Sequence, residues 1–435
     1  MYQPSDFSLR KARELLRSLV SDGPSRLPSL NQVSDAVRVE LERRGRVAIL
    51  YVRLERYGRL EATFGWRIVG DILDAVAADL AGMTGNTLRR LDVVSDFTLT
   101  DDAFMVLLGP PRSSQTIDAA DLAAITRRVQ EHLRALLLDD LAPGVFDRVF
   151  PAVGAATMTA DDSLTFEQNL QRGVALAMQA AAEQAAADFA DLERTLTGCV
   201  ARGELEALFE PVVDPAARRV LGYRSSVRGP FYSPLRLPDV ALDVARRSVL
   251  MTSYGAAARA TSVRAASGLQ SDDLLFLGAV ATEMPNAAVV ALSEFYSLNR
   301  ALVPQRVVFD LDADEIGGNP SSVMRTLADV RDMGFQLCLS GIGVFFAPLE
   351  LIAAAQPDYL ALDPLLVGGV AEESTPVDMV QLLVRFADRI GAQLIAGGVD
   401  TEEQERLLRR SGVELFCGAR YAAADSRPPM VRFRD

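Results

Sequence analysis

Short apolar runs rich in β-forming residues recur eight times between residues 205 and 418, and helical patterns separate most of them. The runs are LEALFEPVV (205–213), RVLGYRSSV (219–227), DLLFLGAV (273–280), RVVFDL (306–311), FQLCLS (335–340), DYLALD (358–363), AQLIAG (392–397) and VELFCG (413–418). Strands that alternate with helices in this way predict a (β/α)8 barrel. In such a barrel the carboxyl ends of the strands carry the chemistry, so a site is expected there.

The first half of the chain has a different order of elements. It reads as a strand (47–54), a helix (64–83), a hairpin (91–109), a helix (117–138), a strand (148–158) and an Ala-rich helix (163–188). This order predicts a compact α/β domain with a central mixed sheet. The predicted fold class is therefore α/β throughout, with an N-terminal helix and linker (1–44), an α/β domain (45–188) and a barrel (189–435).

Two helical segments are candidate contact surfaces. Residues 8–20 form an amphipathic pattern, which is either an ordinary capping helix or a docking element. The Ala-rich stretch 165–195 is expected to join the two domains, and its small residues favour close helix packing, within the chain or across a dimer.

Composition excludes several classes of site. The chain has one histidine, His132, and one lysine, Lys11, so it lacks a multi-histidine zinc site, a P-loop and a catalytic lysine in the barrel. A net charge of −13 disfavours binding to nucleic acid or to an anionic membrane. No run approaches the length of a membrane span, and we see no signal peptide.

The three cysteines Cys199, Cys338 and Cys417 are widely spaced. They are expected to be free buried thiols, which is typical of a reducing, cytoplasmic compartment. The strong preference for arginine over lysine suggests a bacterial chain.

The strand ends hold few reactive groups. Glu210, Asp310, Asp363 and Asp400 could converge, but they are marginal for one divalent ion and too few for two. The alternative, helix caps and ion pairs with the many arginines, is favoured for each aspartate. Asp400 in particular precedes Thr401 and two glutamates, so it is expected to be a helix N-cap.

Over residues 190–430 the chain resembles the EAL phosphodiesterases, which linearise cyclic di-GMP on a (β/α)8 barrel. Residues LFEPVVDPAARRVLGYRSSVRGP correspond to the family's YQPIVD…GYEALLR stretch, and LSGIGVFFAPL to LDDFGTGYSSL. Further along, DYLALD matches DYLKID, and AGGVDTEEQERLLRRSGVELFCG matches AEGVETEEQ…GCDYVQG.

Residues 45–188 resemble the partner family, the GGDEF diguanylate cyclases. The segment TDDAFMVLL corresponds to GGDEFAVLL. The family's leading metal carboxylate is Arg53 here, its guanine-reading Asn and Asp are Glu61 and Ala62, and only Asp102 remains of the signature carboxylates. The resemblance therefore implies a degenerate cyclase site.

The EAL-like half departs from its family at nearly every reacting position. The eponymous Glu-Ala-Leu is Arg224-Ser225-Ser226, and the other lost ligand and catalytic positions are Gly278, Ser340, Gly341, Ala361, Gly397 and Cys417. Three charged positions survive: Asp310, Asp363, and Arg228, the arginine that reaches a phosphate in the family. We hypothesise that Arg224 pairs with Asp310 or Asp363 and occupies the former metal position.

These departures predict a non-catalytic cyclic di-GMP-family protein that works through contacts with a protein partner, without a metal or other cofactor. The alternative is a metal-independent cyclic di-GMP receptor, with Arg228, Arg224, Glu210, Asp310 and Asp363 as candidate ligand-binding residues. In that case Glu210, which replaces the family's first-strand Gln, would repel the dianion. Residual hydrolysis is disfavoured, and a homodimer is an open expectation.

Overall fold

The structure is a computed structural model that describes residues 27, 30–56, 60–83, 88, 92–96, 103–109, 117–139, 148–281, 302–318, 320–343, 348–371, 374–431 and 433. The amphipathic segment 8–20 and the signature-like residues 100–102 lie outside them. The chain divides into two compact units, Met1–Leu60 with Trp66–Leu192, and Glu61–Gly65 with Glu193–Asp435.

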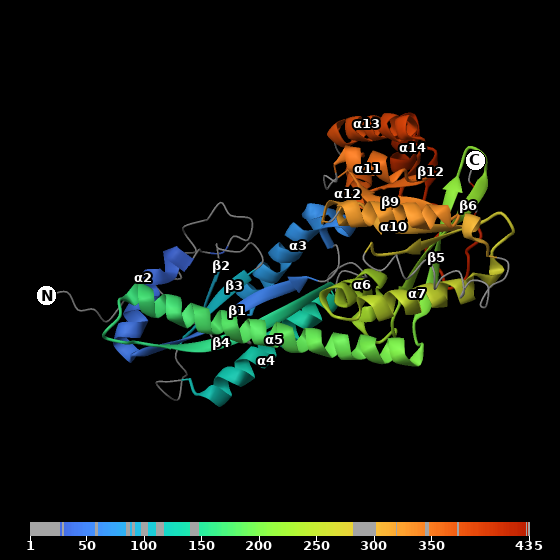
Figure 1. Cartoon of the computed structure of the whole chain (residues 1–435). Coiled ribbons are helices and arrows are strands. Elements are labelled where there is room, and N and C mark those ends of the chain that lie inside the picture. Colours follow the sequence, from blue (N-terminus) through green and yellow to red (C-terminus); the bar gives the residue numbers. More distant parts are fainter. Residues whose placement is uncertain are drawn as a thin grey trace. The chain divides into compact units, whose positions relative to one another are not determined.

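The first unit is a four-stranded sheet with helices (Figure 1). Its elements are α2 (Leu30–Arg44), β1 (Arg46–Arg56), α3 (Leu60–Gly82), β2 (Val93–Asp96), β3 (Ala103–Leu108), α4 (Ala119–Asp139), β4 (Val149–Thr159) and α5 (Phe166–Arg202). The strand order is β2-β3-β1-β4, and every described pairing is antiparallel. The expected mixed sheet was therefore wrong, because β3 lies between β1 and β2, the two strands that a helix connects.

Small residues let α5 lie very close to this sheet. A β-carbon on Gly154 of β4 would fall about 2 Å from backbone atoms of Ala177 and Ala181 in α5. Both alanines belong to a core cluster that also holds Val33 and Val37 of α2, a helix that the sequence patterns did not single out. Ala177 and Ala181 of α5 thus serve packing within the chain. The helix itself runs on to Arg202 and contributes residues to both units.

The second unit is a closed barrel of eight strands in the order β10-β11-β12-β5-β6-β7-β8-β9 (Figure 1). Its strands are β5 (Glu206–Asp214), β6 (Arg219–Arg228), β7 (Leu274–Gly278), β8 (Val307–Asp312), β9 (Gln336–Ile342), β10 (Tyr359–Leu362), β11 (Gln393–Ala396) and β12 (Leu415–Phe416). Each of the eight predicted runs contributes one strand.

Helices follow most of these strands. They are α6 (Pro238–Arg247), α7 (Met251–Ala265), α9 (Asp314–Gly318), α10 (Pro320–Asp332), α11 (Leu349–Ala355), α12 (Pro364–Gly369), α13 (Ser374–Ile390) and α14 (Glu402–Arg410). One feature differs from a uniform (β/α)8 barrel. β5 runs antiparallel to both of its neighbours, β6 and β12, because a short turn rather than a helix joins β5 to β6.

The barrel interior is filled by alternate side chains of the strands, as the pleat requires. Phe276 of β7 and Tyr359 of β10 pack edge to face, with 5.3 Å between their ring centroids. They belong to a buried cluster that includes Val308, Cys338 and Cys417. A larger apolar cluster packs the outer face of the strands against the helices. We call the carboxyl ends of the parallel strands, at one end of this packed interior, the barrel mouth.

In the described part of the chain, no helix is both long and apolar enough to cross a lipid bilayer.

Candidate functional site

An arginine–aspartate pair lies at the barrel mouth. Arg224 of β6 donates from Nη2 to Oδ2 of Asp310 in β8, at 2.6 Å. The two side chains are 28% and 10% exposed, so water screens their attraction only in part. Asp310 raises the pKa of Arg224 well above its usual range, against the opposing effect of burial. The ion pair expected from the sequence is therefore present, with Asp310 as the partner of Arg224.

The guanidinium of Arg224 lies beside Gly397, the residue that follows β11. A β-carbon on Gly397 would lie 3.4 Å from Arg224 Nη1 and 3.5 Å from Cys417 Sγ. These are ordinary van der Waals distances, so Arg224 packs directly beside residue 397. The guanidinium lies among β6, β8, β11 and the end of β12.

A second carboxyl group approaches Arg224 from the opposite side. Glu210 of β5 is the direct cross-strand neighbour of Arg224. Burial raises the pKa of Glu210, while Arg224 and a hydrogen bond with Cys417 act in the other direction. One guanidinium thus lies between two carboxyl groups, of which Asp310 takes the direct hydrogen bond.

Two thiols complete the surroundings of this pair. Burial raises the pKa of Cys417 to about 12, with a further contribution from Glu210. Burial and then Asp310 raise the pKa of Cys338 well above its usual range. Both groups remain neutral at physiological pH, so neither supplies a thiolate. All three cysteines are free and buried, as predicted.

Arg228, the phosphate-reading position of the resemblance, also has an acidic partner. Its Nε and Nη2 lie 2.8 and 2.7 Å from Oε2 of Glu206, its cross-strand neighbour in β5. The Glu206 side chain is 50% exposed, so this pair is more open to water than the pair of Arg224. Arg228 and Arg224 therefore lie on one strand with separate partners.

A third arginine at the mouth repeats the arrangement. Arg246 at the end of α6 lies 3.2 Å from Glu315 and 3.9 Å from Asp312 of β8. Glu315 also accepts a hydrogen bond from the backbone of Ala281, beyond β7. Cations and acids at this mouth are thus largely matched to one another.

The remaining candidate positions carry little chemistry. Asp363 follows β10 and is fully buried, and its backbone carbonyl accepts from Leu366 and Val367 at the start of α12. Gly278 is exposed at the end of β7, with no atom within 4 Å of a β-carbon placed there. The Ser340 hydroxyl donates to the carbonyl of Leu311 at 3.2 Å.

The donor set does not fit a divalent cation. Among the residues that the structure describes, no three His, Cys, Asp or Glu side chains gather as metal ligands. The carboxylate best placed to contribute, Asp310, is bound to Arg224, and a guanidinium at that point repels a cation.

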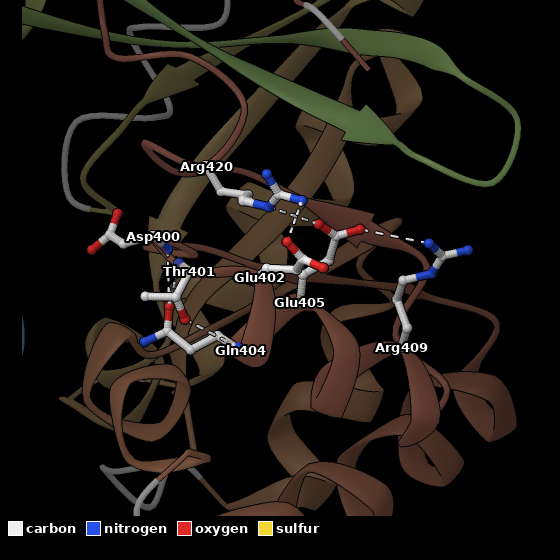
Figure 2. A network of polar contacts seen from close by, with 7 residues as sticks. All are labelled: Asp400, Thr401, Glu402, Gln404, Glu405, Arg409 and Arg420. Carbon is white, nitrogen blue, oxygen red and sulfur yellow. Dashed lines mark hydrogen bonds and ion pairs between the residues drawn. The ribbon is translucent and has the colours of Figure 1, made fainter. Parts of the chain in front are cut away.

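Asp400 is not the helix cap that its position suggested. Thr401 is the N-cap of α14, and its hydroxyl accepts a hydrogen bond from the Gln404 backbone at 3.2 Å. In return, the Gln404 side chain accepts from the backbone of Thr401 at 3.0 Å (Figure 2). Asp400 lies one residue too early, and its Oδ1 accepts from the backbone of Ala419 at 3.3 Å. It thereby ties the segment after β12 to the start of α14.

Arg420 makes a second link between these two segments. Its Nε lies 3.1 Å from Glu405 Oε2, and its Nη2 lies 3.8 Å from Glu402 (Figure 2). Arg409 approaches the other oxygen of Glu405 at 3.5 Å. This network fixes the chain where it leaves the barrel.

Sequence reasoning missed Glu206, Arg246 and Glu315, which neutralise the mouth. Glu206 could have been found from the sequence, since a hairpin register that pairs 210 with 224 also pairs 206 with 228. The contacts of Arg246 depend on the packing of α6 and offered no such signal.

The sequence is similar to those of several known bacterial proteins. The blue light- and temperature-regulated antirepressor BluF of Escherichia coli is 23% identical over 50% of this chain and 53% of its own length. The bifunctional diguanylate cyclase/cyclic di-GMP phosphodiesterase MucR of Pseudomonas aeruginosa is 19% identical over 94% of this chain and 61% of its own. The chain thus spans roughly half the length of these relatives.

The fold also matches solved structures. The EAL domain of FimX from Xanthomonas citri, in complex with c-diGMP, superposes with a TM-score of 0.51 at 15% identity, over 58% of this chain and all of that one. The model of the EAL domain family matches residues 190–424, which is more than half of the chain. With its closed barrel and this match, the chain belongs to the EAL domain family of cyclic di-GMP signalling.

Proposed function

We propose that this EAL domain is non-catalytic and acts through contacts with other proteins. The observation that carries the proposal is the Arg224–Asp310 ion pair, formed by the residue that takes the place of the family's signature glutamate. A guanidinium in that place supplies positive charge where hydrolysis of a phosphodiester by metal ions needs converging oxygen ligands.

The neighbouring positions support the same proposal. Gly278, Gly341, Ala361 and Gly397 bring no ligand or catalytic group to the mouth, and Ser340 uses its hydroxyl on a backbone carbonyl. Asp310 is bound to Arg224, so its charge is already offset. Selection for a folded surface rather than for hydrolysis fits this pattern.

The first unit supports an equivalent loss of cyclase chemistry. Arg53, at the position of the cyclase family's leading carboxylate, lies 3.3 Å from Glu55 in the same strand. We propose that this unit is a degenerate GGDEF-like domain. Among the relatives, BluF is named an antirepressor, a title that describes no reaction on a nucleotide.

A metal-independent receptor for cyclic di-GMP is the second candidate. The half-exposed pair of Arg228 and Glu206 favours it, because a phosphate could replace Glu206 as the partner of Arg228. The FimX structure bound to c-diGMP supplies a precedent within the same fold. Against it, Glu206 and Glu210 would both repel a dianion.

A calorimetric titration with cyclic di-GMP, with and without magnesium or manganese, tests both candidates. We expect no binding at about 100 μM ligand, which means that any binding free energy is weaker than about −5.5 kcal/mol. We also expect chromatography to detect no linear dinucleotide. Tight binding without metal that is lost in Arg228→Ala, and strengthened in Glu206→Gln, would establish the receptor instead. Release of linear product in the presence of metal would overturn the non-catalytic proposal.

A further inference from the structure

The barrel wall is thin at the seam between β5 and β12. β12 has two residues, and it pairs with β5 only at Phe416 and Val213. The first half of β5 therefore has β6 on one side and no barrel strand on the other. Such an edge presents backbone N–H and C=O groups that seek a partner.

The segment after β12 lies on this edge. We call residues 422–431 and 433 the strap. Asp425 exchanges two backbone hydrogen bonds with Phe209 of β5, at 2.7 and 3.2 Å, as in an antiparallel ladder. Ala207 lies on the same edge by the two-residue period of a strand, and no described residue of the strap bonds to it. The strap thus covers part of the edge.

Few further contacts hold the strap. Tyr223 of β6 donates to the carbonyl of Pro429, and Arg218 donates to the carbonyl of Phe433, each at 3.3 Å. Val431 and Phe433 pack against the outer core of the barrel. Residues 423–425 are exposed, and Met430 is 92% exposed.

From residue 425 on, the strap lies beyond the part of the chain that matches the family. The match to the EAL domain ends at residue 424, one residue before the bridge to Phe209. The hydrogen bonds that join the described part of the strap to β5, Tyr223 and Arg218 use backbone atoms of Asp425, Pro429 and Phe433, so another extended chain could make these bonds equally well.

We propose that the edge of β5 beside the strap, which is buried in this structure, is a docking site for an extended segment of a partner protein, and that the strap occupies this site reversibly. The partner adds one antiparallel strand at Ala207 and Phe209 and places two apolar side chains where Val431 and Phe433 lie, a form of strand addition to a sheet edge. This inference deepens the proposed role in protein contacts and rests on it.

The test uses the full chain with a protease site inserted between Ala424 and Asp425. The chain is purified folded and then cut, and a fluorescent peptide of residues 425–435 is titrated by anisotropy. We expect saturable binding to the cut chain and binding at least about tenfold weaker to the uncut chain, because the tethered strap competes at a high effective concentration. Circular dichroism of the cut chain should keep its helical signal.

Three peptides separate strand docking from other contacts. When the fluorophore is joined to the N-terminus of the peptide by an amide bond, Asp425→Pro removes the N–H that bonds to Phe209, and this peptide should bind at least about tenfold more weakly. A peptide with Met430→Ala, altered at an exposed side chain, should bind like the original. A third keeps only the residues at 431 and 433 and has Ser or Thr elsewhere, and it should bind within about tenfold.

Unfolding of the barrel on cleavage, or equal binding of the Asp425→Pro peptide, would overturn the inference. So would loss of binding by the third peptide, because the site would then accept only the sequence of the strap. None of these measurements uses cyclic di-GMP, so their failure is distinct from failure of the non-catalytic proposal.

Discussion

Arg224 Nη1 lies 3.4 Å from the point that a β-carbon on Gly397 would occupy, which is van der Waals contact distance, so the two residues are direct neighbours at the barrel mouth. The same guanidinium holds Asp310 at 2.6 Å. The residues at 224, 310 and 397 thus lie together as one unit, in which Arg224 and Asp310 form an ion pair.

Removing the cation from this unit should destabilise the barrel. In Arg224→Ala, the carboxylate of Asp310 stays buried without its partner, and we expect a loss of about 2–3 kcal/mol in the free energy of unfolding, below the cost for a fully buried pair because Arg224 is partly exposed. Urea denaturation followed by circular dichroism measures it.

Arg228→Ala is the matched control on the same strand. Its partner Glu206 is half-exposed, so the expected loss is about 0–1 kcal/mol. Equal losses for the two variants would show that the Arg224 pair contributes no more than a surface pair.

Glu210 should make stability depend on pH. Burial raises its pKa, so the native state holds this proton more tightly than the unfolded chain does. Its contribution is full below the unfolded pKa of about 4.3 and is lost as pH rises through the folded value. Glu210→Gln should therefore gain stability relative to the parent between about pH 4 and pH 7.5.

Urea midpoints of the parent and of Glu210→Gln at both pH values measure this gain. A difference that stays constant with pH would mean that Glu210 ionises in the barrel as readily as in the unfolded chain.

The thiols should be inert in the folded chain. With a pKa of about 12, Cys417 holds on the order of one thiolate in ten thousand molecules at pH 8. Cys199 and Cys338 are buried too, and their pKa values are also raised. We expect almost no colour with a disulfide reagent until urea is added, and then three equivalents. Rapid labelling of one thiol before unfolding would contradict the closed interior.

The cap of α14 can be assigned by mutation. Thr401→Ala removes the acceptor for the backbone of Gln404 and should cost about 1 kcal/mol, whereas Thr401→Ser should cost little. Asp400→Ala removes only a long hydrogen bond from Ala419 and should cost less than about 0.5 kcal/mol. Thermal melts of the three variants give the order, and a larger effect at Asp400 would return the cap to that residue.

The barrel and the Arg224 pair were predictable for different reasons. Apolar runs in the sequence predicted all eight strands, because the strands of such a barrel are buried on both faces. The pair followed from a gained arginine, lost acidic ligands and the retention of Asp310, provided that strand ends converge. The cap at Thr401 was also predictable, since Thr-x-x-Gln fits a capping box. The prediction assigned the cap to Asp400 instead, because aspartate is also a common cap residue.

Other features depend on structure that the sequence does not reveal. The strap has no strand pattern and contains two prolines, and its pairing with Phe209 exists because β12 ends after two residues. The mixed sheet was a wrong prediction for a similar reason, since strand order is set by how helices cross the sheet. Helix α2 was missed, although Val33 and Val37 pack against the first sheet.

A cation supplied by a side chain differs from one drawn from solution in a simple respect: it never dissociates. Because Arg224 is fixed to β6 by covalent bonds, the charge that this side chain brings to the end of the barrel does not depend on the magnesium or manganese in the surroundings. A chelator should leave this charge unaltered, because the amino-acid sequence sets it and the concentration of metal ions does not.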